Sequence, residues 1–196
     1  MQVESGDVVV VKGKTVVPEE KKVYLAFNKP RGIVCTAEKR EKNNVIDYLS
    51  YPVRIYPVGR LDKDSEGLLL MTNDGAIVNG IMRARNRHEK EYQVEVNKEI
   101  TPEFLKKMAS GVPILDTVTR PCRIRKTGER SFTIILTQGL NRQIRRMCEA
   151  LGYRVTKLKR VRIMNVHLKD LKTGEYRPLT EKELAELKKQ IGEEKR

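Results

Sequence analysis

Three carboxylates lie close together in the segment Gly59–Gly67, which reads GRLDKDSEG between two apolar stretches. An ionised carboxylate in such a turn is a compact oxygen nucleophile that can form and break a bond to carbon. Metal binding is the competing chemistry, because Asp62, Asp64 and Glu66 match the first, third and fifth positions of an EF-hand loop. The twelfth position is Asn73, where that loop needs a bidentate Glu, so calcium is rejected. A polar turn without any chemistry stays open at this point.

A second group of charged residues begins a predicted helix after QGLN, where Arg142, Arg145 and Arg146 follow closely. Cations at a helix N-terminus oppose the helix dipole. They become favourable if an anion binds there, because backbone N–H groups and guanidinium groups then converge on it. That anion is either a phosphate of a ligand or a carboxylate of the same chain. A solvated basic face is the alternative, and the residues alone leave it open.

Tyr92 opens the alternating strand pattern YQVEV directly after the charged segment HEKE. A tyrosine at this position can be an ordinary half-buried strand residue. It can equally offer a flat ring on which an unstacked nucleobase lies. The pattern by itself does not separate these two roles.

The composition favours a polyanionic partner. Lys and Arg number 40 against 26 Asp and Glu, a formal net charge of +14, which favours nucleic acid. Membrane binding is disfavoured, because Trp is absent and no apolar stretch is long enough to span a bilayer. The cysteines Cys35, Cys122 and Cys148 are far apart and predict neither a zinc site nor a disulfide framework. We therefore expect no metal, reduced thiols and a cytoplasmic protein.

The hydrophobic pattern mixes strands and helices irregularly, which is typical of an α+β fold with a mixed, mostly antiparallel sheet. Helix starts are signalled at Asp74, Thr101, Asn141 and Thr180, the last of which forms a capping box with Glu183. The expected strands cover residues 7–12, 23–28, 68–72, 92–96, 118–124, 132–137 and 162–168.

Five segments, taken in order, carry a specific resemblance to a known family. They read AFNKPRGIVCT, PVGRLDKDSEGLLLMTNDG, HEKEYQVEV, LTQGLNRQIRRMCEALGY and KLKRVRIMNV. Over residues 23–190 the chain resembles the RsuA/RluB/RluE/RluF branch of pseudouridine synthases. Within the branch, HEKEY, GVPILDTVT and QGLNRQIRRMCE look most like the F-type synthases of the ribosomal large subunit. The resemblance implies a pseudouridine synthase fold whose sheet spans two subdomains, with a catalytic cleft between them.

The resemblance also implies roles for individual residues. Asp62 is expected to be the catalytic carboxylate, Arg145 its ion-pair partner and Tyr92 the ring that stacks under the flipped target base. Asp64 and Glu66 are expected to shape the turn without taking part in catalysis. The residues expected to bind RNA are Lys29, Arg60, Asn141, Arg142, Arg146, Leu158 and Arg160.

These RNA contacts differ in kind. By the same resemblance, the two arginines Arg142 and Arg146 would face phosphates. Leu158 would pack against the base, and Arg60 would fill the space that the base vacates. Either Lys29 or the guanidinium of residue 160 would lie near a phosphate or in the wall of the site. The isomerisation of uridine consumes no water, electrons or group donor, so no cofactor is expected.

The resemblance divides the chain into three parts. Residues 1–20 resemble the last strand and exit of an S4 RNA-binding domain followed by a linker, 21–191 the catalytic domain, and 192–196 are expected to be a frayed tail. We expect a shortened form of a longer protein, because a lone final strand has no partner. The expected partner is 23S ribosomal RNA and the expected state a monomer. The alternatives are a 16S rRNA or tRNA target, or a non-catalytic rRNA-binding or ribosome-assembly protein.

Overall fold

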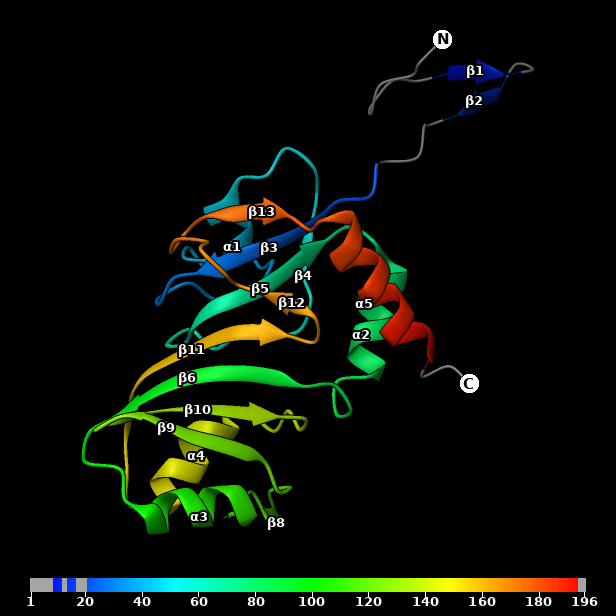
Figure 1. The fold of residues 1–196 in the computed structure, drawn as a ribbon. Helices are drawn as coiled ribbons and strands as arrows, with labels where there is room; N and C mark the ends of the chain where they lie inside the picture. The colour runs from blue at the N-terminus through cyan, green and yellow to red at the C-terminus, as the bar shows by residue number, and fades with distance from the viewer. Residues whose placement is uncertain (1–8, 12–13, 17–20, 194–196) are drawn as a thin grey trace.

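The computed structural model describes residues 9–11, 14–16 and 21–193. Figure 1 shows one long twisted sheet with helices packed against it. The strands of this sheet are β3 (Tyr24–Lys29), β4 (Tyr56–Pro57), β5 (Glu66–Thr72), β6 (Lys90–Val96), β9 (Arg123–Gly128), β10 (Ser131–Leu136), β11 (Val155–Ile163), β12 (Val166–His167) and β13 (Tyr176–Pro178). The helices are α1 (Val45–Leu49), α2 (Gly75–Arg83), α3 (Pro102–Ser110), α4 (Gln143–Ala150) and α5 (Glu181–Glu193).

The order of strands along the sheet is β13–β3–β5–β11–β6–β10–β9, with β12 paired to β11 and β4 paired to β5. Strands β5 and β11 run parallel, and the other pairs in the sheet are antiparallel. The predicted α+β fold with a mixed, mostly antiparallel sheet is therefore confirmed. The parallel pair lies in the middle of the sheet, with β3 and β13 on one side of it and β6, β10 and β9 on the other.

Two short hairpins lie outside this sheet. The first pairs β1 (Val9–Val11) with β2 (Lys14–Val16), and the second pairs β7 (Pro113–Ile114) with β8 (Thr117–Val118). The described part of the strand expected over residues 7–12, Val9–Val11, is thus paired, not alone. The remaining residues of the 1–20 segment lie outside the described part of the chain, and the S4 resemblance there stays a prediction.

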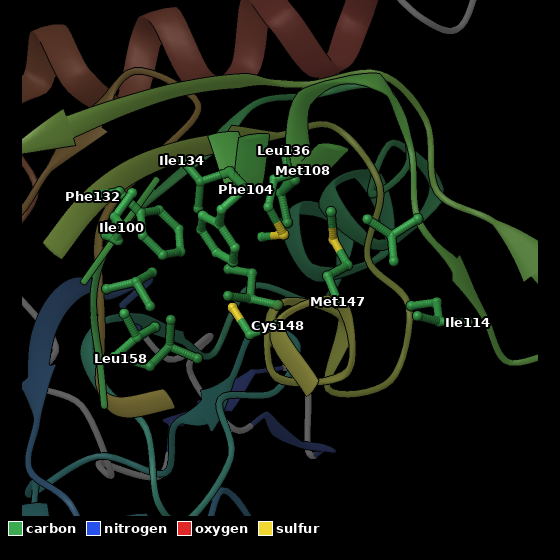
Figure 2. Close-up of a cluster of buried hydrophobic side chains, with 14 residues drawn as sticks. Ile100, Phe104, Met108, Ile114, Phe132, Ile134, Leu136, Met147, Cys148 and Leu158 are labelled. Carbon is green, nitrogen blue, oxygen red and sulfur yellow. The ribbon is translucent and has the colours of Figure 1, made fainter. Parts of the chain in front are cut away.

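Apolar residues gather in three clusters around the sheet. At one end of the sheet, α3 and α4 cover one face of β6, β10 and β11, as Figure 1 shows. Figure 2 shows Phe104 and Met108 of α3 and Met147 of α4 pointing into this cluster, together with Phe132 and Leu158 from the strands. Around β3 and β5 both faces of the sheet are covered, one by α1 and the loops around it and the other by α2 and α5.

Gly67 allows strands β5 and β11 to pair. It lies in β5 opposite Arg160 of β11 and has a φ of +109°. A Cβ atom placed on Gly67 would lie 2.2 Å from the carbonyl oxygen of Arg160. Only glycine tolerates both this backbone conformation and this close approach. The central pairing therefore depends on one residue at the end of the GRLDKDSEG segment.

The helix starts were predicted correctly in three cases out of four. Asp74 accepts the N–H of Ala76 at 3.1 Å, and Thr101 accepts that of Phe104 at 3.1 Å. At the fourth helix the prediction was wrong, because the N-cap of α4 is Arg142, with a φ of 48° and no side-chain capping bond. Residues 192–193 continue α5 and residues 194–196 lie outside the described part, so the frayed tail stays a prediction.

Two predicted strands are also wrong in their bounds. The strand expected over 118–124 is interrupted, because the N–H of Cys122 donates to the carbonyl of Ala109 at the end of α3 at 2.9 Å. The strand expected over 162–168 is broken at Met164, which has a φ of 54°. Strand β11 instead begins at Val155, seven residues earlier than expected.

The capping box of α5 gives the first testable prediction. Glu183 accepts the N–H of Thr180 at 2.9 Å and both guanidinium N–H groups of Arg177, at 2.7 and 2.9 Å. Hydrogen bonding to Arg177 is the main reason that the pKa of this buried carboxyl falls to about 2. Glu183→Gln is expected to lower the free energy of unfolding by about 2–3 kcal/mol at pH 7.

The sign of the pH dependence follows from the lowered pKa. The ionised Glu183 stabilises the fold above its ordinary pKa near 4.5, and this stabilisation is lost as the pH falls toward 2. Urea unfolding should therefore separate the native protein from Glu183→Gln at pH 7, with the difference shrinking below pH 5. A constant difference across this range would contradict the assignment.

No helix in the described ranges is both long and apolar enough to cross a membrane.

Candidate active site

The acidic turn lies between β4 and β5 and is fixed by backbone hydrogen bonds. The N–H of Ser65 donates to the carbonyl of Asp62 at 3.0 Å, which closes the turn. The N–H of Gly32 donates to the carbonyl of Lys63 at 2.7 Å, which ties the turn to the segment after β3. The Asp62 side chain is 35% exposed. The turn therefore holds this carboxylate at the surface on a rigid backbone.

Lys29 lies buried beneath this turn. Its ammonium group donates to the carbonyls of Pro30 at 2.9 Å and Ile33 at 2.7 Å. Burial lowers the pKa of Lys29, and the nearby Cys35 and Asp62 oppose that shift. The ammonium is enclosed by backbone carbonyls, and its contact with a phosphate stays a prediction. Its position agrees with the other option, the wall of the site.

Arg160 and Leu158 on β11 are also buried, each 6% exposed. The Arg160 guanidinium donates to the carbonyl of Leu68 at 2.9 Å and to that of Arg60 at 3.5 Å. Leu158 belongs to the apolar cluster that Figure 2 shows. The position of Arg160 agrees with its predicted place in the wall of the site, and packing of Leu158 against the base stays a prediction. Both support the wall on which the turn rests.

Arg145 reaches the turn from α4, but not at the expected residue. Its guanidinium donates to the carbonyl of Asp64 and to the hydroxyl of Ser65, both at 3.1 Å, and lies 3.5 Å from an Asp64 carboxylate oxygen. The predicted ion pair between Arg145 and Asp62 was therefore wrong in this structure. The reason is geometric: the first turn of α4 lies over the later part of the acidic turn.

Arg142 makes the contact with Asp62 instead. Its two terminal nitrogens donate to the two carboxylate oxygens of Asp64, each at 3.0 Å, and one of them lies 3.4 Å from an Asp62 oxygen. Hydrogen bonding to Arg142 is the main reason that the pKa of Asp64 is lowered. In this structure Arg142 faces these two carboxylates, and its contact with an RNA phosphate stays a prediction. The anion at the start of α4 is a carboxylate of the same chain.

Tyr92 lies close to this arrangement within the sheet. It pairs with Arg160 of β11, and Arg160 pairs with Gly67 of β5, directly after the acidic turn. Two strand spacings, about 10 Å, therefore separate the backbone of Tyr92 from that of Gly67. The half-buried Tyr92 ring packs against the apolar cluster under α4, so it lies on the face from which Arg145 reaches the turn. The catalytic roles of these residues stay predictions.

The remaining predicted RNA-binding residues lie at the surface. Arg60 and Asn141 are exposed, and Arg146 is half-buried. Arg146 donates to the backbone carbonyl of Asn141 at 3.0 Å and to its side-chain oxygen at 2.9 Å. Asn141 thus holds an arginine side chain in place instead of capping the helix. Both residues remain available as surface candidates for RNA contact.

Other candidate groups are limited in the described part of the chain. No three His, Cys, Asp or Glu side chains there are grouped to hold a metal ion. The three cysteines are free thiols. Burial raises the pKa of Cys122 to about 11 and that of Cys148 to about 12. Such thiols are poor nucleophiles at neutral pH.

Sequence reasoning missed two features of the turn. Asp64 was assigned to turn shape, yet it holds both Arg142 and Arg145. Ser65 was not considered, although its hydroxyl accepts from Arg145. The signal that could have indicated Asp64 was its position two residues after Asp62, opposite a helix start with three arginines.

This fold and this arrangement agree with a comparison to known families. Residues 23–150 match the RNA pseudouridylate synthase family, and the chain belongs to that family. It is 54% identical over 192 residues to the dual-specificity RNA pseudouridine synthase RluF of Escherichia coli (strain K12), covering 97% of this chain and 66% of that protein. The chain thus spans slightly less than two thirds of the RluF proteins that it matches.

Two further relatives support the same family. The chain is 35% identical to ribosomal large subunit pseudouridine synthase B of Bacillus subtilis, covering 96% of this chain and 80% of that protein. A crystal structure of a pseudouridylate synthase superimposes with a TM-score of 0.78 at 29% identity, covering 95% of this chain and 83% of that one. The predicted family and its fold are confirmed.

Proposed function

We propose that this protein converts a uridine of 23S ribosomal RNA to pseudouridine. The observation that carries the proposal is the Asp62 carboxylate, which lies partly exposed on a turn fixed by backbone hydrogen bonds, in a chain of this family. An isomerase of this kind breaks the bond between N1 and C1′, turns the base and forms a bond between C5 and C1′. The C5 proton leaves and N1 gains one, so the atoms balance without a cofactor or metal.

Each residue has a distinct task in this proposal. The Asp62 carboxylate acts at the junction of sugar and base. Tyr92 stacks under the base after the nucleotide has left its helix or loop, and its hydroxyl assists removal of the C5 proton. Arg60 fills the space that the base leaves, and Arg146 with Asn141 contacts the RNA backbone. The net charge of +14 supports a polyanionic substrate.

The large-subunit target rests on the resemblance of HEKEY, GVPILDTVT and QGLNRQIRRMCE to the F-type synthases of the ribosomal large subunit. The RluF proteins are 53–55% identical to this chain, whereas ribosomal large subunit pseudouridine synthase B of Bacillus subtilis and ribosomal small subunit pseudouridine synthase A of Yersinia pestis are each 35% identical. The name of the RluF proteins states a dual specificity, so a second RNA target is part of the test. We place the protein in the cytoplasm as a monomer, where it meets ribosomal RNA.

Tritium release provides the test. Transcripts of 23S rRNA, 16S rRNA and tRNA, each carrying uridine with tritium at C5, are incubated separately with the chain. Release from 23S rRNA, at a single site when pseudouridines are mapped, is the expected result. Release from 16S rRNA or tRNA without release from 23S rRNA would overturn the target. Binding of RNA without release from any transcript would make the protein a non-catalytic RNA-binding protein.

A further inference from the structure

Two carboxylates and two guanidinium groups meet at the acidic turn, and they are shared unequally. Asp64 receives both terminal nitrogens of Arg142 at 3.0 Å and lies 3.5 Å from Arg145. Asp62 has one contact of 3.4 Å with Arg142. Paired N–H···O bonds to one carboxylate are the strongest arrangement that an arginine makes. Both terminal nitrogens of the Arg142 guanidinium are therefore bonded to Asp64, and Asp62 has only a longer contact with one of them.

The two arginines are held to the turn in different ways. Arg145 has a side chain that is only 9% exposed, and it donates to the backbone carbonyl of Asp64 and to Ser65. These contacts would survive the loss of the Asp64 carboxylate. Arg142 is 39% exposed, and its hydrogen bonds to the turn are all to carboxylate oxygens of Asp64 and Asp62. Its position therefore depends on Asp64.

We propose that Asp64 is a positioning residue that holds Arg142 away from Asp62 and so leaves the Asp62 carboxylate free to react. This inference rests on the proposed function and deepens it. A carboxylate that accepts a bidentate arginine has its oxygen lone pairs and its charge engaged, which weakens it as a nucleophile or base. With Asp64 present, both terminal nitrogens of Arg142 are hydrogen-bonded to Asp64. The partly exposed Asp62 carboxylate therefore keeps oxygen lone pairs that can react.

The structure explains why one residue change would redirect the arginine. An Arg142 nitrogen already lies 3.4 Å from Asp62. If Asp64 becomes a neutral amide, the guanidinium loses its charged partner, and Asp62 is the adjacent carboxylate that can accept it. The backbone of the turn would stay in place, because it is fixed by Gly32 and Ser65. The expected consequence is a new pairing between Arg142 and Asp62 without loss of the fold.

The test measures single-turnover tritium release at saturating 23S rRNA. Asp64→Asn is expected to slow release about 10- to 100-fold, with the dissociation constant for RNA changed much less. The decisive variant is the double change Asp64→Asn with Arg142→Gln, which removes the redirected guanidinium. Its rate is expected to exceed that of Asp64→Asn alone. A purely structural role for Asp64 would not be rescued by a second substitution.

The matched control is Asp116→Asn, an identical change at an exposed position with a φ of 60°, which Asn also adopts. Thermal unfolding of each variant shows that it folds. The inference is overturned if Asp64→Asn releases tritium at the native rate, or if the double variant is as slow as Asp64→Asn. A native protein that releases no tritium overturns the proposed function instead, so the two failures are distinguishable.

Discussion

Asp62→Asn is expected to lower tritium release from 23S rRNA by at least about 10³-fold. The amide keeps the size and shape of the side chain but removes the charge and the nucleophilic oxygen. Because the Asp62 side chain is 35% exposed and makes a single 3.4 Å ion-pair contact among the described residues, the fold should tolerate the change. This variant should therefore lose activity while it keeps the stability of the native protein.

Three measurements check this expectation. Single-turnover tritium release gives the rate, thermal unfolding gives the stability, and filter binding to the same RNA gives the affinity. Asp116→Asn, the exposed Asp in the β7–β8 hairpin, serves as the control and should behave like the native protein. If Asp62→Asn retains the native rate, another carboxylate performs the reaction and the assignment of this turn is wrong.

Tyr92→Phe is expected to bind RNA with near-native affinity and to turn over about 10²-fold more slowly. The phenylalanine keeps the flat ring on which a base can stack, and it keeps the packing of position 92 against the apolar cluster under α4. Only the hydroxyl is lost, and with it the group that assists removal of the C5 proton. The effect should thus appear in the rate constant and not in binding.

Tyr153→Phe is the matched control for this prediction. Tyr153 packs against the same apolar cluster, and its hydroxyl donates to the carbonyl of Glu99 at 2.9 Å. Its loss should lower the free energy of unfolding by about 1 kcal/mol and leave the rate unchanged. A Tyr92→Phe protein with the native rate would reduce Tyr92 to a stacking residue, and one that no longer binds RNA would assign the hydroxyl to binding.

The features that the sequence predicted correctly are local. Asp74 and Thr101 are caps that accept N–H groups two or three residues further along the chain, and the Thr180–Glu183 box closes over three residues. Alternating apolar residues likewise placed β6 and β10 to within two residues at each end. Such signals depend on neighbours in the chain, so tertiary structure did not override them.

The features that failed depend on contacts between distant residues. Whether Arg145 meets Asp62 or Asp64 is decided by the placement of α4 over a turn about 80 residues earlier in the chain. Residues 118–124 looked like one strand, but the backbone there bonds to the end of α3. Lys29 carries a charge that predicts exposure, and only the carbonyls gathered around it make its burial acceptable.

The most direct measurement is a crystal structure of the chain with a 23S rRNA fragment whose target uridine is replaced by 5-fluorouridine. In 5-fluorouridine a fluorine replaces the C5 hydrogen, so the rearranged base has no C5 proton to lose. The reaction cannot be completed, and the rearranged nucleotide should stay bound. We predict that its sugar and base lie against the Asp62 carboxylate, with the ring of Tyr92 under the base and Arg142 still paired to Asp64. A fragment bound with its fluorinated base remote from both Asp62 and Tyr92 would contradict the account.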